Sequence, residues 1–83
     1  MALAKVEIEQ ILLESVGKAM GRDPQTLTTD MRWQEDLGFK SVQGMKVCGL
    51  LNYKLKVTVP LGGLVACATL DDAVDMLDAL VNT

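Results

Sequence analysis

The stretch Glu35-Asp36-Leu37-Gly38-Phe39-Lys40-Ser41-Val42 decides the fold, because a polar loop ends within it and a long amphipathic run begins. Apolar residues then recur every three or four positions, which is the spacing of one face of an α-helix. We therefore predict a helix from Ser41 to about Leu55 whose buried stripe consists of Val42, Met45, Cys48, Leu51 and Leu55. Gly44 and Gly49 each lower its helix propensity by about 1 kcal/mol relative to alanine, which indicates either close packing or a surface kept open.

Ser41 is predicted to start that helix, where its hydroxyl is exposed. The backbone N–H groups of Val42, Gln43 and Gly44 have no partner within the helix, and the helix dipole is positive at this end. These features favour a covalently attached phosphate. A serine at a helix start is also a common N-cap, so capping is the alternative interpretation.

Other segments also have helical patterns. The first runs from Leu3 to Met20, ends at Gly21, and has an apolar face made of Ile8, Ile11, Leu12, Val16, Ala19 and Met20. A helical turn over Pro24 to Leu27 leads into a loop that reaches Gly38 and is anchored by Leu27, Met31, Trp33 and Leu37.

Two helices are predicted in the last third of the chain. A short one spans Leu61 to Ala66, after an extended connection at Val57 to Val59. The last helix begins with a capping-box variant, Thr69-Leu70-Asp71-Asp72, and its apolar face consists of Ala73, Val74, Leu77, Leu80 and Val81. The chain is therefore predicted to be all-α and to form a single domain over residues 1–83, with three long helices and a short one.

The composition excludes several classes of function. The 83 residues are 49% hydrophobic but include only three aromatic residues, which favours packed helices over a β-sandwich or a barrel. A net charge of −3 does not suit general nucleic-acid binding. Because the chain has no histidine, Ser-His and Cys-His catalytic pairs and histidine-containing zinc sites are excluded.

No targeting signal or membrane-spanning run is apparent, so we expect a cytoplasmic protein. Cys48 and Cys67 have no metal-ligand neighbours in the sequence and are predicted to be reduced core residues. Met1 followed directly by an orderly helix favours a free-standing protein.

The order of these elements, with Ser41 opening the second long helix, closely resembles the acyl carrier protein family. The Glu-Asp-Leu-Gly-x-x-Ser pattern at Glu35 to Ser41 matches the attachment loop of that family. Trp33 before the loop, the stretch Val57 to Pro60, and the pattern formed by Thr69, Leu70, Ala73 and Leu77 also fit. The resemblance covers almost the whole chain.

The resemblance implies a four-helix bundle in which Ser41 carries a 4′-phosphopantetheine arm. A phosphopantetheinyl transferase would attach the arm from coenzyme A, and the thiol of the arm would hold acyl groups as thioesters. The partners would be ketosynthases, acyltransferases or other acyl-processing enzymes. The chain itself would be a non-catalytic monomer without a metal or a nucleic-acid partner.

The sequence departs from the family around the attachment residue. The family usually has Asp before the serine and Leu after it, where this chain has Lys40 and Val42. Lys46, Leu50 and Lys54 follow along one face of the same helix, and no acidic residue lies between Leu37 and Leu70. In fatty-acid carriers this face is typically acidic.

We therefore expect a specialised polyketide or modified fatty-acyl pathway whose enzymes dock on Phe39, Lys40, Val42, Lys46, Val47, Leu50 and Lys54. Exchanging Lys46 and Lys54 for glutamate is then expected to improve recognition by fatty-acid synthase enzymes. An ordinary solvated lysine face is the simpler interpretation.

Other functions remain as alternatives. A peptidyl or aminoacyl carrier usually has Gly-Gly-His/Asp-Ser at the attachment loop, which Gly38-Phe39-Lys40-Ser41 does not match. An unmodified helical interaction subunit with the same fold is favoured only by Lys40. Asp71, Asp75 and Asp78 share a helix face, but the helix dipole and the cap account for acids there better than a divalent cation does.

Overall fold

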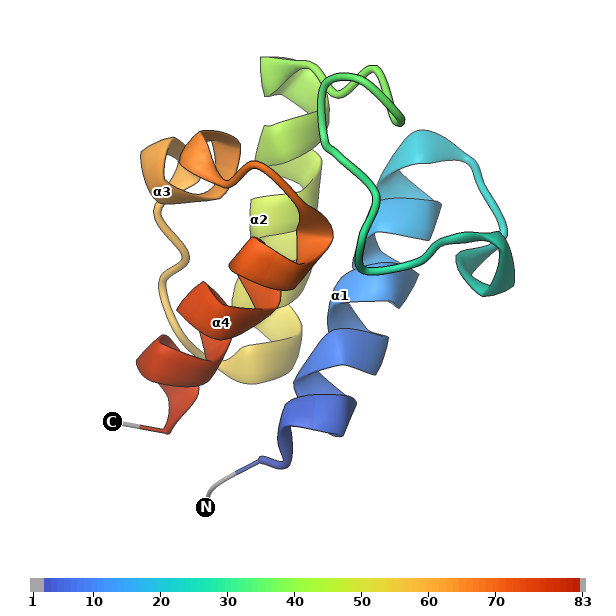
Figure 1. Ribbon diagram of the computed structural model, residues 1–83. Coiled ribbons are helices and arrows are strands. Elements are labelled where there is room, and N and C mark those ends of the chain that lie inside the picture. Colours follow the sequence, from blue (N-terminus) through green and yellow to red (C-terminus); the bar gives the residue numbers. More distant parts are fainter. Residues whose placement is uncertain (1–2, 83) are drawn as a thin grey trace.

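The structure is a computed structural model that describes residues 3–82. Its elements are α1 (Lys5–Met20), the 3₁₀ turn η1 (Pro24–Thr26), α2 (Ser41–Leu55), α3 (Leu61–Ala66) and α4 (Leu70–Val81). Helix α1 packs against both α2 and α4, and the short α3 bridges α2 and α4 (Figure 1). Within residues 3–82 there is no strand, only an isolated bridge between Arg32 and Thr69. The predicted all-α, four-helix fold is confirmed.

Local signals in the sequence set the helix ends. Gly21 ends α1 in the left-handed conformation, with φ of 68°, and its N–H donates to the Gly17 carbonyl. The hydroxyl of Thr69 accepts a hydrogen bond from the Asp72 N–H (3.2 Å), and the Asp72 carboxylate accepts one from the Thr69 N–H (3.3 Å). The predicted capping box at the start of α4 is therefore confirmed. Helix α1 starts at Lys5, two residues later than predicted.

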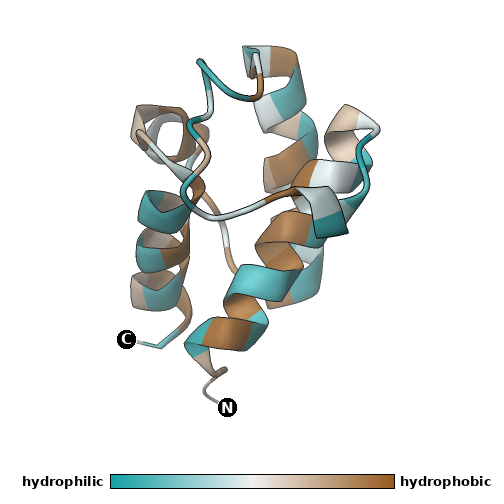
Figure 2. Cartoon of the chain, turned by 45° about the vertical axis from the view of Figure 1, so that its right-hand side comes forward, coloured by the Kyte–Doolittle hydropathy of each residue, from teal (hydrophilic) through white to brown (hydrophobic). Residues whose placement is uncertain are grey.

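The core is mainly aliphatic and is shared by all four helices and the long loop. Figure 2 shows apolar and polar bands alternating along the helices, as expected for amphipathic helices with one buried face. Of the predicted apolar faces, Ile8, Leu12 and Val16 of α1 and Ala73, Val74 and Leu77 of α4 are buried. Leu27, Trp33 and Leu37 of the loop are also buried, while Met31 is half-buried.

The buried face of α2 differs from the prediction. Val42 and Met45 are 60% and 63% exposed, whereas Gly44 and Val47 are buried together with Cys48, Leu51 and Leu55. Leu80 of α4, also predicted to be buried, is exposed. Cys48, Leu51 and Leu55 are thus buried as predicted, and the difference is confined to the first two turns of α2, where Val42 and Met45 lie at the surface.

Two sets of contacts between distant segments close the bundle. Leu3 and Asn82 exchange two hydrogen bonds, which tie the start of α1 to the end of α4. At the other end, the loop before α2 lies along the start of α4: the Leu70 N–H donates to the Met31 carbonyl (3.0 Å) and the Asp71 N–H to the Thr29 carbonyl (2.8 Å). Across the described residues, no helix is both long and apolar enough to cross a membrane.

Candidate functional site

The backbone that precedes Ser41 is held in a compact turn. The Asp36 carboxylate accepts a hydrogen bond from the Arg32 N–H (2.8 Å), and the Gly38 N–H donates to the Gln34 carbonyl (3.2 Å). Gly38 has φ of 60°, in the left-handed region where a residue without Cβ is least strained. The turn therefore fixes the direction in which the chain enters α2.

An aromatic pair lies beneath this turn. The ring centroids of Trp33 and Phe39 are 4.5 Å apart, and the indole N–H of Trp33 donates to the Thr69 carbonyl (3.1 Å). Phe39 is only 2% exposed, so the prediction that it contacts partner enzymes is wrong. Its side chain anchors the base of α2 instead, because an aromatic ring next to Trp33 is more stable buried than in water.

The hydroxyl of Ser41 is exposed and is not used for capping. Lys40 is the N-cap residue and Ser41 is the first residue of α2. The side-chain oxygen of Gln43 caps the helix by accepting a hydrogen bond from the Lys40 N–H (2.8 Å). Ser41 itself makes no side-chain hydrogen bond to any of residues 3–82, so the alternative interpretation as an N-cap is wrong. The capping role of Gln43 was not predicted from the sequence, although a glutamine at the third helical position is a capping signal.

Fewer backbone N–H groups are free at this helix start than predicted. The N–H groups of Gln43 and Gly44 both donate to the Lys40 carbonyl at 3.0 Å. Only those of Ser41 and Val42 are left without an acceptor among the described residues. The positive end of the helix dipole remains, and it would stabilise an anion attached to the Ser41 oxygen.

Of the two explanations predicted for the glycines of α2, close packing applies to Gly44, which is buried inside the bundle. A Cβ atom at this position would lie 2.8 Å from Cδ1 of Leu61 and 3.2 Å from Cε2 of Phe39. Because Gly44 has no side chain, α3 and the aromatic pair can approach α2 closely. Gly49 is the opposite case, because a Cβ there would meet nothing within 4 Å.

The predicted docking residues do not all lie on the surface. Lys40, Val42 and Lys46 are exposed and Leu50 is half-buried. Val47 is fully buried, so the prediction that it takes part in docking is wrong: it belongs to the core stripe that Val42 and Met45 were expected to form. Lys54 pairs with Glu14 of α1 (3.2 Å), which partly neutralises its charge.

Three of the four acidic residues of α4 have structural partners. Asp75 pairs with Lys5 (2.5 Å), Asp72 belongs to the capping box, and Asp78 accepts a hydrogen bond from the Asn82 side chain (2.6 Å). Among residues 3–82, no group of three or more Cys, Asp or Glu side chains is placed to hold a metal ion. Contacts within the bundle therefore account for Asp72, Asp75 and Asp78.

Both cysteines are free in the described structure. Burial raises the pKa of the Cys48 thiol, and burial together with the charge of Asp72 raises the pKa of the Cys67 thiol. Neither has the low thiol pKa of a catalytic cysteine.

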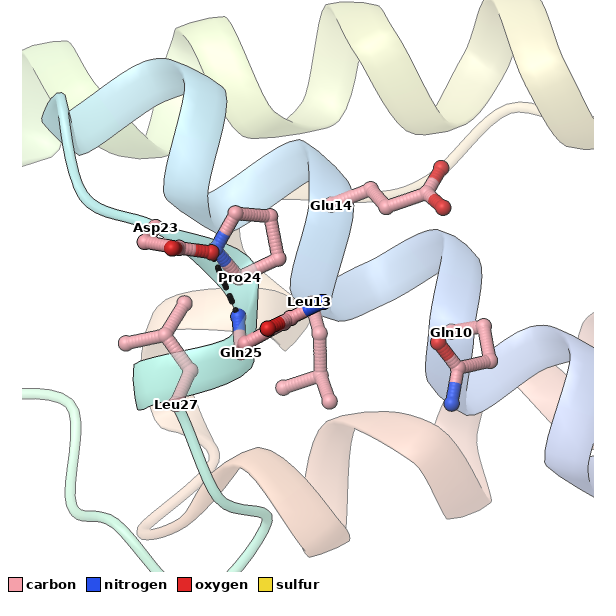
Figure 3. A pocket seen from close by; sticks show the side chains of 7 residues that line it. All are labelled: Gln10, Leu13, Glu14, Asp23, Pro24, Gln25 and Leu27. Carbon is pink, nitrogen blue, oxygen red and sulfur yellow. Dashed lines mark hydrogen bonds between the residues drawn. The ribbon is translucent and has the colours of Figure 1, made fainter.

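A hollow of 490 Å³ lies between α1 and η1 (Figure 3). Leu13 and Leu27 contribute apolar surface to it, and polar side chains such as Gln10 and Gln25 line the rest. None of its lining residues belongs to α2 or to the turn before Ser41. It is therefore not part of the site around this serine.

Comparison with protein families gives a match that covers most of the chain. The model of a family described as the phosphopantetheine attachment site matches residues 10–77, most of the chain. No curated protein shows a significant match. Domains of this family are the site of covalent 4′-phosphopantetheine attachment; they interact with phosphopantetheinyl transferases and acyl-processing enzymes, and are in general not catalysts. The four helices, the exposed serine at the start of α2 and the extent of the match agree, and the chain belongs to the phosphopantetheine attachment site family.

Proposed function

We propose that Ser41 carries the 4′-phosphopantetheine arm and that the chain is an acyl carrier for a specialised polyketide or modified fatty-acyl pathway. The observation that carries the proposal is the exposed Ser41 hydroxyl, which has no hydrogen-bond partner among the described residues and stands at the positive end of a fifteen-residue helix. The chain contains only one other serine, Ser15. Ser15 is buried, and its hydroxyl donates to the Ile11 carbonyl (2.8 Å).

The attachment chemistry requires a nucleophilic oxygen that an enzyme can reach. The Oγ atom of Ser41 forms a bond to the β-phosphorus of coenzyme A while the phosphoanhydride bond breaks and 3′,5′-adenosine bisphosphate leaves. The hydroxyl proton is lost to a base on the transferase or to water. This chain contributes the oxygen, its fixed position on α2 and the local positive potential of the helix start. Once attached, the thiol of the arm supplies the thioester that holds the acyl group.

Intact-mass measurement after incubation with coenzyme A and a promiscuous phosphopantetheinyl transferase tests the proposal. The wild-type chain is expected to gain the mass of one phosphopantetheine. Ser41→Ala is expected to gain none, whereas Ser15→Ala is the matched control and is expected to be modified like the wild type. An unmodified wild-type chain, or modification of Ser41→Ala, contradicts the proposal.

An unmodified interaction subunit with this fold is the second candidate, and Lys40 is the observation that favours it. A lysine directly before the serine replaces the acid that transferases of this family often contact. The same mass measurement separates the two candidates, because an interaction subunit gains no mass.

We also propose that the exposed cations near Ser41 direct the carrier away from fatty-acid synthase enzymes. Lys40 and Lys46 are exposed, and α2 contains no acidic residue. Since Lys54 pairs with Glu14, reversing its charge would place two carboxylates together. The cleaner variant is therefore Lys40→Glu with Lys46→Glu, which is expected to raise kcat/KM with a fatty-acid ketosynthase. An unchanged kcat/KM contradicts this part of the proposal.

A further inference from the structure

An open groove lies on the surface between α1 and α2, close to the start of α2. Its volume is 370 Å³, and it is lined by Lys18, Ala19, Met45, Lys46, Gly49 and Leu50. We call it the α1–α2 groove. The sequence does not predict this groove. Met45 is expected in the core, and the helix that contains Lys18 and Ala19 is not expected to contribute to the site.

The floor of the α1–α2 groove is apolar and is not filled by this chain. Met45 is 63% exposed, although a methionine side chain is more stable when buried. Gly49 has no side chain, and a Cβ atom there would meet nothing within 4 Å. The groove can therefore accept an apolar side chain from another molecule without any rearrangement of the bundle.

The rim of the groove is positively charged. Lys18 of α1 and Lys46 of α2 both line it, and both are exposed. Helix α2 contributes no acidic residue, and the nearby Glu14 is paired with Lys54. A molecule that covers the groove must therefore either leave two ammonium groups without water or provide carboxylates for them.

The position of the groove identifies the molecule that covers it. Met45 is one helical turn from Ser41, and Leu50 lies nine residues along α2, about 14 Å at 1.5 Å per residue. A standard protein interface buries about 800 Å² on each partner, which is a disc about 16 Å in radius. Met45, four residues after Ser41, lies on the same side of α2, so an enzyme that approaches Ser41 from this side across an interface of this size covers the α1–α2 groove as well.

We propose that the phosphopantetheinyl transferase that modifies this chain docks in the α1–α2 groove, placing an apolar side chain against Met45 and Gly49 and carboxylates against Lys18 and Lys46. This inference rests on the proposed attachment at Ser41. It extends docking from α2 alone to a surface that α1 shares, and it assigns the transferase an acidic contact surface.

The test is steady-state kinetics of Ser41 modification with coenzyme A. The probe is the transferase of the source organism that has the highest kcat/KM for the wild-type chain. Lys18→Glu and Lys46→Glu are each expected to raise KM for the carrier about fivefold or more with little change in kcat, because rim charges act on the encounter of the two proteins. Added salt is expected to raise KM of the wild type and to have a smaller effect on both variants.

The control for net charge is Lys56→Glu, which makes the same change at the far end of α2. It is expected to leave KM close to that of the wild type. Gly49→Leu tests the apolar floor: it fills the groove, so KM is expected to rise while the thermal midpoint stays at or above that of the wild type. This combination separates a docking effect from a folding defect.

Three results would overturn the inference. The first is an equal rise in KM for Lys56→Glu and Lys46→Glu, which would mean that only net charge matters. The second is an unchanged KM in both Lys18→Glu and Gly49→Leu. The third is a dimer of the wild type in sedimentation that Gly49→Leu abolishes, because a second copy would then occupy the groove. Each of these differs from a failure of the proposed function, in which the wild type is not modified at all.

Discussion

Replacing Gly44 and Gly49 by alanine, one at a time, should have opposite effects on stability although both lie within α2. Each substitution removes the helix-propensity penalty of glycine, which is about 1 kcal/mol. At Gly49 nothing opposes this gain, because the new Cβ meets no atom within 4 Å. Gly49→Ala is therefore expected to raise the free energy of unfolding by about 1 kcal/mol.

At Gly44 the new methyl group collides with the core. It would lie 2.8 Å from Cδ1 of Leu61, and 3.2 Å and 3.3 Å from Cε2 and Cζ of Phe39. The ring of Phe39 cannot move away easily, because it packs against Trp33. Overpacking of this kind costs about 1–3 kcal/mol, so Gly44→Ala is expected to lower the free energy of unfolding by about 1 kcal/mol after the propensity gain.

Urea and thermal unfolding followed by far-UV circular dichroism measure the difference between the two variants. A gap of about 2 kcal/mol corresponds to a difference of about 8–16 °C in the thermal midpoint of a domain of this size. The Leu61→Ala background is the control, since removal of the Leu61 methyl groups should make Gly44→Ala less costly. If both glycine variants are stabilised equally, Gly44 is not in contact with α3 and the described packing of α2 is refuted.

Three further predictions concern a cap, a helix end and the cysteines. Thr69→Ala should lower the free energy of unfolding in urea by about 1 kcal/mol, because the Asp72 N–H loses its acceptor; an unchanged value would mean that water replaces the cap. Lys56→Gly should raise the free energy of unfolding in urea by about 0.5–1 kcal/mol, because Lys56 is held at φ of 60°, where glycine is less strained than lysine. A loss of stability would contradict this prediction. Because burial raises the pKa of both cysteine thiols, Cys48 and Cys67 should react with iodoacetamide more slowly than glutathione does at mildly alkaline pH. Their reaction rates should increase as the pH rises. If mass spectrometry shows that they react as fast as glutathione, this prediction is contradicted.

The helices could be predicted from the sequence because their ends carry strong local signals. Ser41–Leu55 and Leu61–Ala66 were predicted with the bounds that the structure has, and Gly21 and Thr69 mark ends whose cap geometry is local. Such signals depend on a few neighbouring residues and need no knowledge of the tertiary fold.

The orientation of α2 could not be predicted in the same way. Apolar residues cover so much of this helix that the stripe through Val42 and Met45 and the stripe through Val47 both have helical spacing. The choice between them depends on Gly44, whose missing side chain provides the contact surface for Leu61 and Phe39. A glycine adds nothing to a hydrophobic pattern, so the pattern alone gives no sign of this contact.

The position of Ser41 could be predicted from the sequence, but the contacts around it could not. The predicted place of Ser41, exposed at the start of α2, is confirmed, and its role as the attachment residue stays a prediction. The hydrogen bonds that Gln43 and Gly44 make to the Lys40 carbonyl depend on how tightly the first turn is wound, which residue types do not specify. The α1–α2 groove brings together residues of two helices and required the packing of the whole bundle.

The hydrogen bonds between the loop and the start of α4 have a consequence for biosynthesis. The turn beneath Ser41 is held by Trp33, whose indole N–H donates to the Thr69 carbonyl thirty-six residues away in the chain. During translation the ribosome adds Thr69 long after Ser41, so a nascent chain that already exposes Ser41 lacks the partner that fixes this turn. An enzyme that requires the folded base of α2 will therefore modify the completed chain in preference to the nascent one.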